Sequence, residues 1–133
     1  MLARASFWSA RVWWVNKSGR LSDTANSLIE KYRKSKQTVI PSITAWEISI
    51  LVSKGRLKLS MDVDSWLNLA GQIENLEFFP LGNEILVEST RLPGDFHKDP
   101  TDRMIMAQAR VLSAPLLTID ERIQAYPHVK AIW

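Results

Sequence analysis

Short apolar runs alternate with longer segments of helical periodicity along this chain, and this alternation restricts its possible folds most. Four runs have the mostly apolar character of strands buried on both faces, namely Gln37–Ser42, Leu76–Leu81, Ala114–Asp120 and His128–Trp133. Between them, helical spacing predicts helices over about 25–32, 43–53, 63–73 and 100–112 and a shorter one from about 85, with Ser42, Asp62 and Asn83 as caps. The pattern predicts one α/β domain, residues 1–133, with a central parallel sheet flanked by helices.

The composition narrows the chemistry of any site. The chain has no cysteine, which excludes disulfides and thiolate zinc sites and leaves oxygen ligands and two histidines for a cation. No apolar run is long enough to span a bilayer, and the amino terminus does not resemble a signal peptide, so we expect a cytoplasmic protein with no membrane partner. The net charge is +3, and basic residues cluster in 31–36 and 54–58, which favours an anionic partner.

A glutamate falls on the predicted inner face of the helix over 43–53. At about 100° per residue, Glu47 lies within an apolar stripe made by Ile43, Trp46, Ile50 and Leu51. Carboxylates are seldom buried without a partner. The sequence therefore predicts that Glu47 meets a cation or a proton donor.

Two aspartates are expected at the same edge of the sheet. Asp102 lies near the start of the helix over 100–112, and Asp120 directly follows the run that ends in Ile119. Helices that follow parallel strands begin at the carboxyl edge of the sheet, so Asp102 and Asp120 should converge there with Glu47 about a turn deeper. Three carboxylates in a partly dry cleft need a cation, and hard oxygen ligands favour Mg²⁺ or Mn²⁺. Such an ion can activate a water for phosphodiester hydrolysis.

Each acid also has a structural interpretation. Asp99 before Pro100 is typical of a helix N-cap followed by proline at the first helical position. Asp102 taken singly is explained by the helix dipole, and Asp120 can cap a short following helix. Glu47 is hardest to explain this way, and the three acids together favour a site.

Secondary candidates are weaker. Thr118 can orient a metal-bound water, although a threonine in a strand usually has no such role. Arg103 can meet phosphate, but pairing with Asp99 is the stronger expectation. His97 and His128 are expected in loops, and the glycine spacing matches neither a dinucleotide-binding nor a P-loop pattern.

The order of motifs resembles one family, the PIN-domain ribonucleases, and specifically the VapC-type toxins of bacterial toxin–antitoxin pairs. The matching stretches are VWWV, GRLSDTANSLIE, VIPSITAWEISILVSKGRLKL, FFPL, HKDPTDRMIMAQA, LLTID and YPHVKAIW. The resemblance implies a three-layer α/β fold, a Mg²⁺-dependent endoribonuclease acting on RNA, a homodimer, and inhibition by a cognate antitoxin. By position, Glu47, Asp102 and Asp120 match the metal-binding acids of the family, and Asp99 matches a less certain neighbour.

The chain departs from this family at its amino terminus. The family begins with an apolar strand that ends in a metal-binding aspartate, whereas the first carboxylate here is Asp23 and Phe7 lies near the expected aspartate. Residues 1–11 are therefore expected to be divergent or out of frame, with a degenerate first strand. Loss of a direct ligand should weaken metal binding and reduce activity.

Three hypotheses follow from the sequence. The first is a VapC-like ribonuclease impaired by the missing aspartate. The second is a catalytically silent binding module that dimerises and binds an antitoxin or RNA. The third is a purely structural basic domain, in which removing Glu47 would increase stability and change nothing else.

Overall fold

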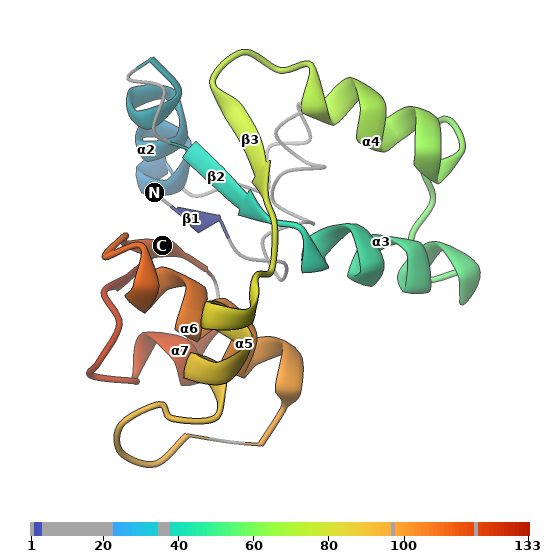
Figure 1. Ribbon diagram of the computed structural model, residues 1–133. Coiled ribbons are helices and arrows are strands. Elements are labelled where there is room, and N and C mark those ends of the chain that lie inside the picture. Colours follow the sequence, from blue (N-terminus) through green and yellow to red (C-terminus); the bar gives the residue numbers. More distant parts are fainter. Residues whose placement is uncertain (1, 4–22, 35–37, 97, 119) are drawn as a thin grey trace.

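The computed structural model describes residues 2–3, 23–34, 38–96, 98–118 and 120–133, and their strands form one parallel sheet (Figure 1). The strand order is β3-β2-β1-β4-β5. The strands are β1 (Leu2–Ala3), β2 (Thr38–Pro41), β3 (Leu76–Phe79), β4 (Leu116–Leu117) and β5 (Ala131–Ile132). The helices are α2 (Asp23–Lys34), α3 (Ile43–Ser53), α4 (Val63–Gly71), α5 (Asn83–Ser89), α6 (Pro100–Val111) and α7 (Glu121–Gln124).

Neighbouring residues of β2 and of β4 belong to different apolar cores, because side chains of a strand alternate between the two faces of a sheet. In β4, Leu116 belongs to the core with α5, α6 and α7, whereas Leu117 belongs to the core with α2. In β2, Val39 and Ile40 divide in the same way. Both faces of the sheet are therefore buried, as the apolar runs predicted.

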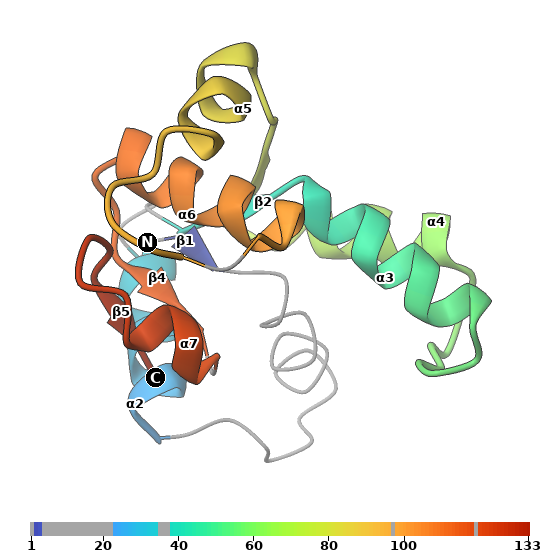
Figure 2. The same ribbon diagram turned by 90° about the horizontal axis from the view of Figure 1, so that it is seen from below.

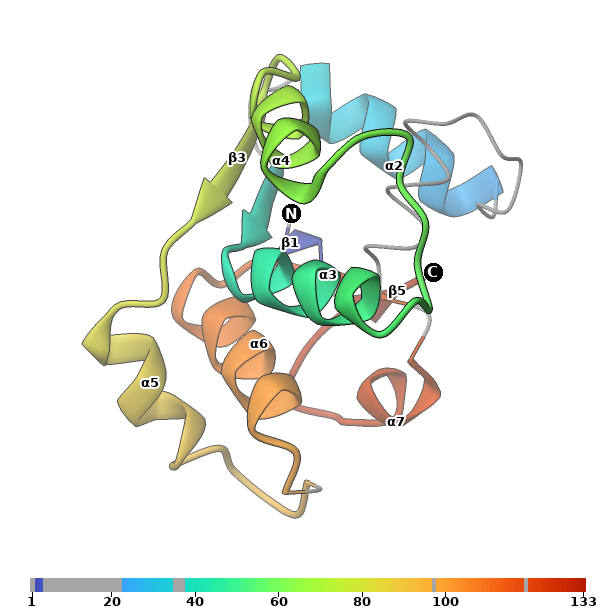
Figure 3. The same cartoon turned by 90° about the vertical axis from the view of Figure 1, so that its right-hand side faces the viewer.

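The helices form a layer on each side of the sheet. Figure 3 shows α2 and α4 in the upper part of the view and α5, α6 and α7 in the lower part, with β1, β2 and β5 between them. The α6 helix fills the centre of the lower layer, where residues 105–109 are buried. The predicted three-layer α/β fold with a central parallel sheet is confirmed.

The first strand occupies the centre of the sheet with two residues. Leu2 aligns with Val39 of β2 on one side and with Leu116 of β4 on the other. The described part of this central strand is Leu2–Ala3, so the expectation of a degenerate first strand stays a prediction. Phe7, which was expected near the family's aspartate, lies outside the described residues.

The prediction for the buried face of α3 was wrong. The buried residues of this helix are Thr44 and Ile48, and Trp46 is 56% exposed. Because the apolar side chains of α3 itself project on nearly every side of the helix, periodicity could not identify its inner face. Ile48 packs with Trp66 and Ala70 of α4 in a third core.

Within the described residues, no helix has both the length and the apolar character needed to cross a membrane.

The helix caps were predicted with mixed success. Asp62 caps α4, where its carboxylate accepts hydrogen bonds from the backbone N–H and the hydroxyl of Ser65. These two bonds lower the pKa of Asp62. Asn83 is instead the first residue of α5, because the extended residue before it is Gly82. Ser42 precedes α3 as expected, but its side chain makes no capping bond and its backbone N–H donates to Phe79.

The strands begin later or end earlier than the apolar runs that predicted them. The last run began at His128, whereas β5 spans Ala131–Ile132. The third run began at Ala114, whereas β4 begins at Leu116. Apolar character does not by itself indicate strand pairing, so it extended the predicted strands into the loops beside them, of which His128 and Lys130 are exposed.

Candidate metal centre

The sheet topology predicts a ligand site at the carboxyl ends of β1 and β4. The chain proceeds from β1 to β2 and β3 on one side, whereas β4 and β5 lie on the other. Ligands of open α/β sheets bind at such a switch point, beyond the carboxyl ends of the strands. The end of α6 leads into β4, so α6 begins at this same edge (Figure 2).

Asp102 lies in the first turn of α6, at this edge. Its side chain is only 4% exposed. Asp99 is the N-cap, as predicted, and its Oδ1 accepts a hydrogen bond from the Asp102 backbone N–H at 2.9 Å. Pro100 follows at the first helical position, where its missing N–H has no consequence. The cap and the proline fix the start of the helix and thereby place the Asp102 carboxylate.

Asp120 lies just beyond β4. Its Oδ1 caps α7 by accepting from the backbone N–H groups of Arg122 at 2.9 Å and Ile123 at 3.4 Å. The hydroxyl of Thr118, which is fully buried, accepts from the Asp120 backbone N–H at 3.1 Å. The capping role predicted for Asp120 is confirmed, and its Oδ2 points to a different group.

A guanidinium lies between the two aspartates. Arg122 Nη2 is 3.6 Å from Asp102 Oδ2 and 3.4 Å from Asp120 Oδ2. Since one nitrogen contacts both carboxylates, the structure brings Asp102 and Asp120 together. Sequence reasoning missed Arg122, although its spacing of two residues from Asp120 was a usable signal.

The third predicted acid is not gathered into the same group. Glu47 is half-buried on α3, and within the part of the chain that the structure describes no three acids or histidines assemble as a metal-binding cluster. Its role as a ligand stays a prediction. Mg²⁺ commonly uses one or two carboxylates and completes its shell with water and substrate oxygens. The buried Asp102 carboxylate beside that of Asp120 therefore fits a divalent cation.

Arg103 has a different set of partners from the one predicted. Its Nε donates to the Ser89 carbonyl at 2.9 Å, and its Nη1 donates to the Phe96 carbonyl at 3.3 Å. These contacts tie α6 to the end of α5 and to the loop that follows it. Arg103 thus binds backbone carbonyls there, rather than the expected Asp99 carboxylate.

An apolar pocket lies at the same edge of the sheet. It has a volume of about 480 Å³ and is lined by Ser42, Ile43, Trp46, Leu81, Pro100, Thr101 and Met104. Its walls come from the beginnings of α3 and α6, next to the positions of Glu47 and Asp102 in the sequence. The exposed indole of Trp46 is part of this pocket.

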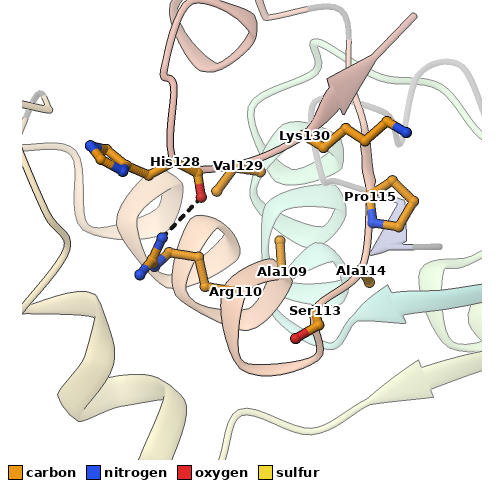
Figure 4. Close-up of a pocket in the computed structure, with 8 residues that line it drawn as sticks. All are labelled: Ala109, Arg110, Ser113, Ala114, Pro115, His128, Val129 and Lys130. Carbon is orange, nitrogen blue, oxygen red and sulfur yellow. Dashed lines mark hydrogen bonds between the residues drawn. The ribbon is translucent and has the colours of Figure 1, made fainter.

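A second pocket, of about 330 Å³, lies at the opposite edge of the sheet (Figure 4). It is formed where α6 ends and where the chain enters β4 and β5. Arg110 Nη1 donates to the His128 carbonyl at 2.9 Å, and the Lys130 and His128 side chains point in different directions (Figure 4). Nearby, burial raises the pKa of Tyr126. This pocket is separated by the length of the strands from Asp102 and Asp120.

The Asp99 cap yields a prediction about stability. Asp99→Ala is expected to reduce the free energy of unfolding by about 0.5–2 kcal/mol, because the Asp102 backbone N–H loses its acceptor. Urea denaturation followed by circular dichroism measures the change. Asp95→Ala, at an exposed loop position, is the control, and an equal loss in both variants would contradict the capping role.

Comparison with known proteins agrees with the fold and with the motif order. The family model described as PIN domain matches residues 9–129. Ribonuclease VapC22 of Mycobacterium tuberculosis (strain ATCC 25618 / H37Rv) is 29% identical over 121 residues, which cover 90% of this chain and 88% of that protein. The resemblance to VapC-type proteins that the motifs indicated is thereby confirmed.

Two solved structures share the architecture. VapBC2 from Rickettsia felis, crystallised with a DNA fragment from its promoter, aligns with a TM-score of 0.67 and 20% identity, covering 99% of this chain and 98% of that one. A toxin–antitoxin complex from Klebsiella pneumoniae aligns with a TM-score of 0.65 and 17% identity, covering 99% and 95%. At these identities the likeness shows a common fold.

Proposed function

This chain belongs to the PIN domain family, and from that premise we propose that it is a Mg²⁺-dependent endoribonuclease toxin of the VapC type. The observation that carries the proposal is the buried Asp102 carboxylate next to Asp120 at the carboxyl edge of the sheet. The name of the relative Ribonuclease VapC22 supports the reaction class. Hydrolysis of RNA phosphodiester bonds is the proposed reaction.

Asp102 and Asp120 would hold Mg²⁺ or Mn²⁺, with Glu47 as the third proposed ligand. When bound, the ion lowers the pKa of a water molecule and offsets charge on the phosphate. The residues around the pair keep it in place: Asp99 fixes the start of α6, and Thr118 fixes the backbone of Asp120. The basic residues in 31–36 and 54–58 supply charge suited to an RNA backbone.

Partner chains are a further part of the proposal. The solved relatives include complexes of a toxin with its antitoxin, which supports a cognate antitoxin for this chain. Large apolar side chains are exposed on α3, on α4 and the loop before it, and on α5, namely Trp46, Met61, Leu69, Leu86 and Val87. Exposed apolar surface favours association, so an antitoxin and a second copy of the chain are the proposed occupants. A cytoplasmic location is proposed because the RNA substrate is found there.

A second candidate function is a catalytically silent binding module of the same fold. The observation that favours it is the sequence before Asp23, which has no aspartate, glutamate, histidine or cysteine. Because β1 lies beside β4, a carboxylate following β1 would have joined Asp120 at the switch point. Without that acid, the protein would bind an antitoxin or RNA and cleave slowly or not at all.

An RNA cleavage assay separates the two functions. The purified chain is incubated with labelled single-stranded RNA in Mg²⁺, in Mn²⁺ and in EDTA. Cleavage that needs the divalent ion supports the nuclease, and RNA or antitoxin binding that a chelator leaves unchanged, without cleavage, supports the silent module. Cleavage of equal rate in EDTA would contradict the metal-dependent reaction.

The missing amino-terminal acid yields a gain-of-function prediction. Phe7→Asp is expected to increase Mg²⁺-dependent cleavage about tenfold or more, because one direct ligand is restored. Initial rates on the same RNA measure the gain, with Phe7→Asn as the matched control that adds no charge. Robust cleavage by the unaltered chain, with no gain in Phe7→Asp, would refute the impairment.

A further inference from the structure

We propose that Arg122 is a built-in counter-ion of the Asp102–Asp120 pair, which a divalent cation must displace before it can bind. This inference rests on the proposed function, since it assumes that the pair takes a metal ion. It assigns to Arg122 a role in setting the metal affinity of the site. No nucleophilic or acid–base role is assigned to this residue.

The geometry shows one nitrogen shared by two acids. Arg122 Nη2 lies 3.6 Å from Asp102 Oδ2 and 3.4 Å from Asp120 Oδ2. A strong charge-assisted hydrogen bond between nitrogen and carboxylate is shorter, about 2.7–2.9 Å. The guanidinium therefore supplies charge between the carboxylates while it holds neither of them tightly.

The three side chains differ in exposure. That of Arg122 is 66% exposed, whereas those of Asp102 and Asp120 are 4% and 14% exposed. An exposed arginine is hydrated and its ion pairs are weak, so the side chain can rotate into solvent at little cost. The carboxylates cannot follow, because helix starts fix both backbones.

This difference determines which partner leaves when a metal ion arrives. A divalent ion carries twice the charge of guanidinium and coordinates carboxylate oxygens directly. It therefore replaces Arg122 beside fixed ligands, but it must first break the two contacts that the arginine makes. The apparent metal affinity is accordingly lower than that of the same acids without Arg122.

Titration with Mn²⁺ alone tests the proposal. Isothermal calorimetry compares the wild-type chain with Arg122→Gln and with Arg110→Gln. Arg110 is the matched control because it also makes an ion pair, with its Nε 3.6 Å from Glu88 Oε1. It lies about two turns beyond Asp102 in α6, away from the acid pair. We expect Arg122→Gln to bind Mn²⁺ about fivefold more tightly, because the ion no longer has to break an exposed ion pair, whose energy is small. Arg110→Gln should bind Mn²⁺ as the wild type does.

Thermal unfolding in EDTA distinguishes this role from a purely structural one. Loss of the counter-ion should lower the Tm of Arg122→Gln by about 2 °C in EDTA, and saturating Mn²⁺ should raise that Tm by more than it raises the wild-type Tm. A lower Tm with unchanged Mn²⁺ affinity would overturn the proposal and leave the metal site intact. Absence of Mn²⁺ binding in both proteins would instead overturn the proposed function, and with it the role of Arg122.

Discussion

Asp102→Asn is expected to abolish metal-dependent RNA cleavage, with a fall in rate of at least about 100-fold. The substitution removes the charge that attracts the ion while it preserves the size of the side chain. Asp102 is buried at the start of α6, so water cannot replace its carboxylate as it does at an exposed position. Cleavage rates with Mg²⁺ or Mn²⁺, in the natural chain and in the Phe7→Asp background, measure the effect.

The control for this variant is Asp64→Asn, an exposed aspartate in the first turn of α4. It also lies in the first turn of a helix, but far from the acid pair in the sequence, so its cleavage rate should match that of the parent chain. Both variants should retain the circular dichroism spectrum of the parent. Cleavage by Asp102→Asn within twofold of the parent rate would show that this carboxylate does not hold the ion.

Ile105→Ala is expected to reduce the free energy of unfolding by about 2–5 kcal/mol. Ile105 is fully buried in α6, in the core shared with Leu116 of β4. Removing its side chain loses transfer free energy and leaves a cavity that the packed layers cannot fill. Guanidinium denaturation of the purified chain gives the change directly.

Leu86→Ala on α5 provides the comparison, because Leu86 is partly exposed. Its substitution should change the free energy of unfolding by less than about 1 kcal/mol. If Ile105→Ala cost no more than Leu86→Ala, α6 would not be the central helix of the fold in solution.

The architecture could be predicted because burial on both faces of a parallel sheet leaves a clear sequence signal. The runs around Ile40, Phe78 and Leu116 became strands, and the helical segments between them became the two covering layers. The start of α6 was also predictable, since the cap at Asp99 and the proline after it follow local rules.

Other features depend on tertiary context that local rules do not contain. The apolar character of α3 is so uniform that its inner face could not be read, and Trp46 was placed inside when it lies outside. The pairing of Arg122 with Asp102 joins residues twenty positions apart, and it depends on how α7 is placed against α6. The carboxyl-edge position of Asp102 and Asp120 was predictable from topology, whereas the guanidinium of Arg122 between them was not.

The most direct test of the account is calorimetric titration of the chain with Mn²⁺ and with Mg²⁺, before and after Asp120→Asn. Asp120 is the appropriate target because its Oδ2 faces the Asp102 carboxylate across Arg122. We predict saturable binding of a divalent ion by the natural chain and loss of most of that binding in the variant. Equal binding by both proteins, or no binding by the natural chain, would contradict a metal centre built on this pair.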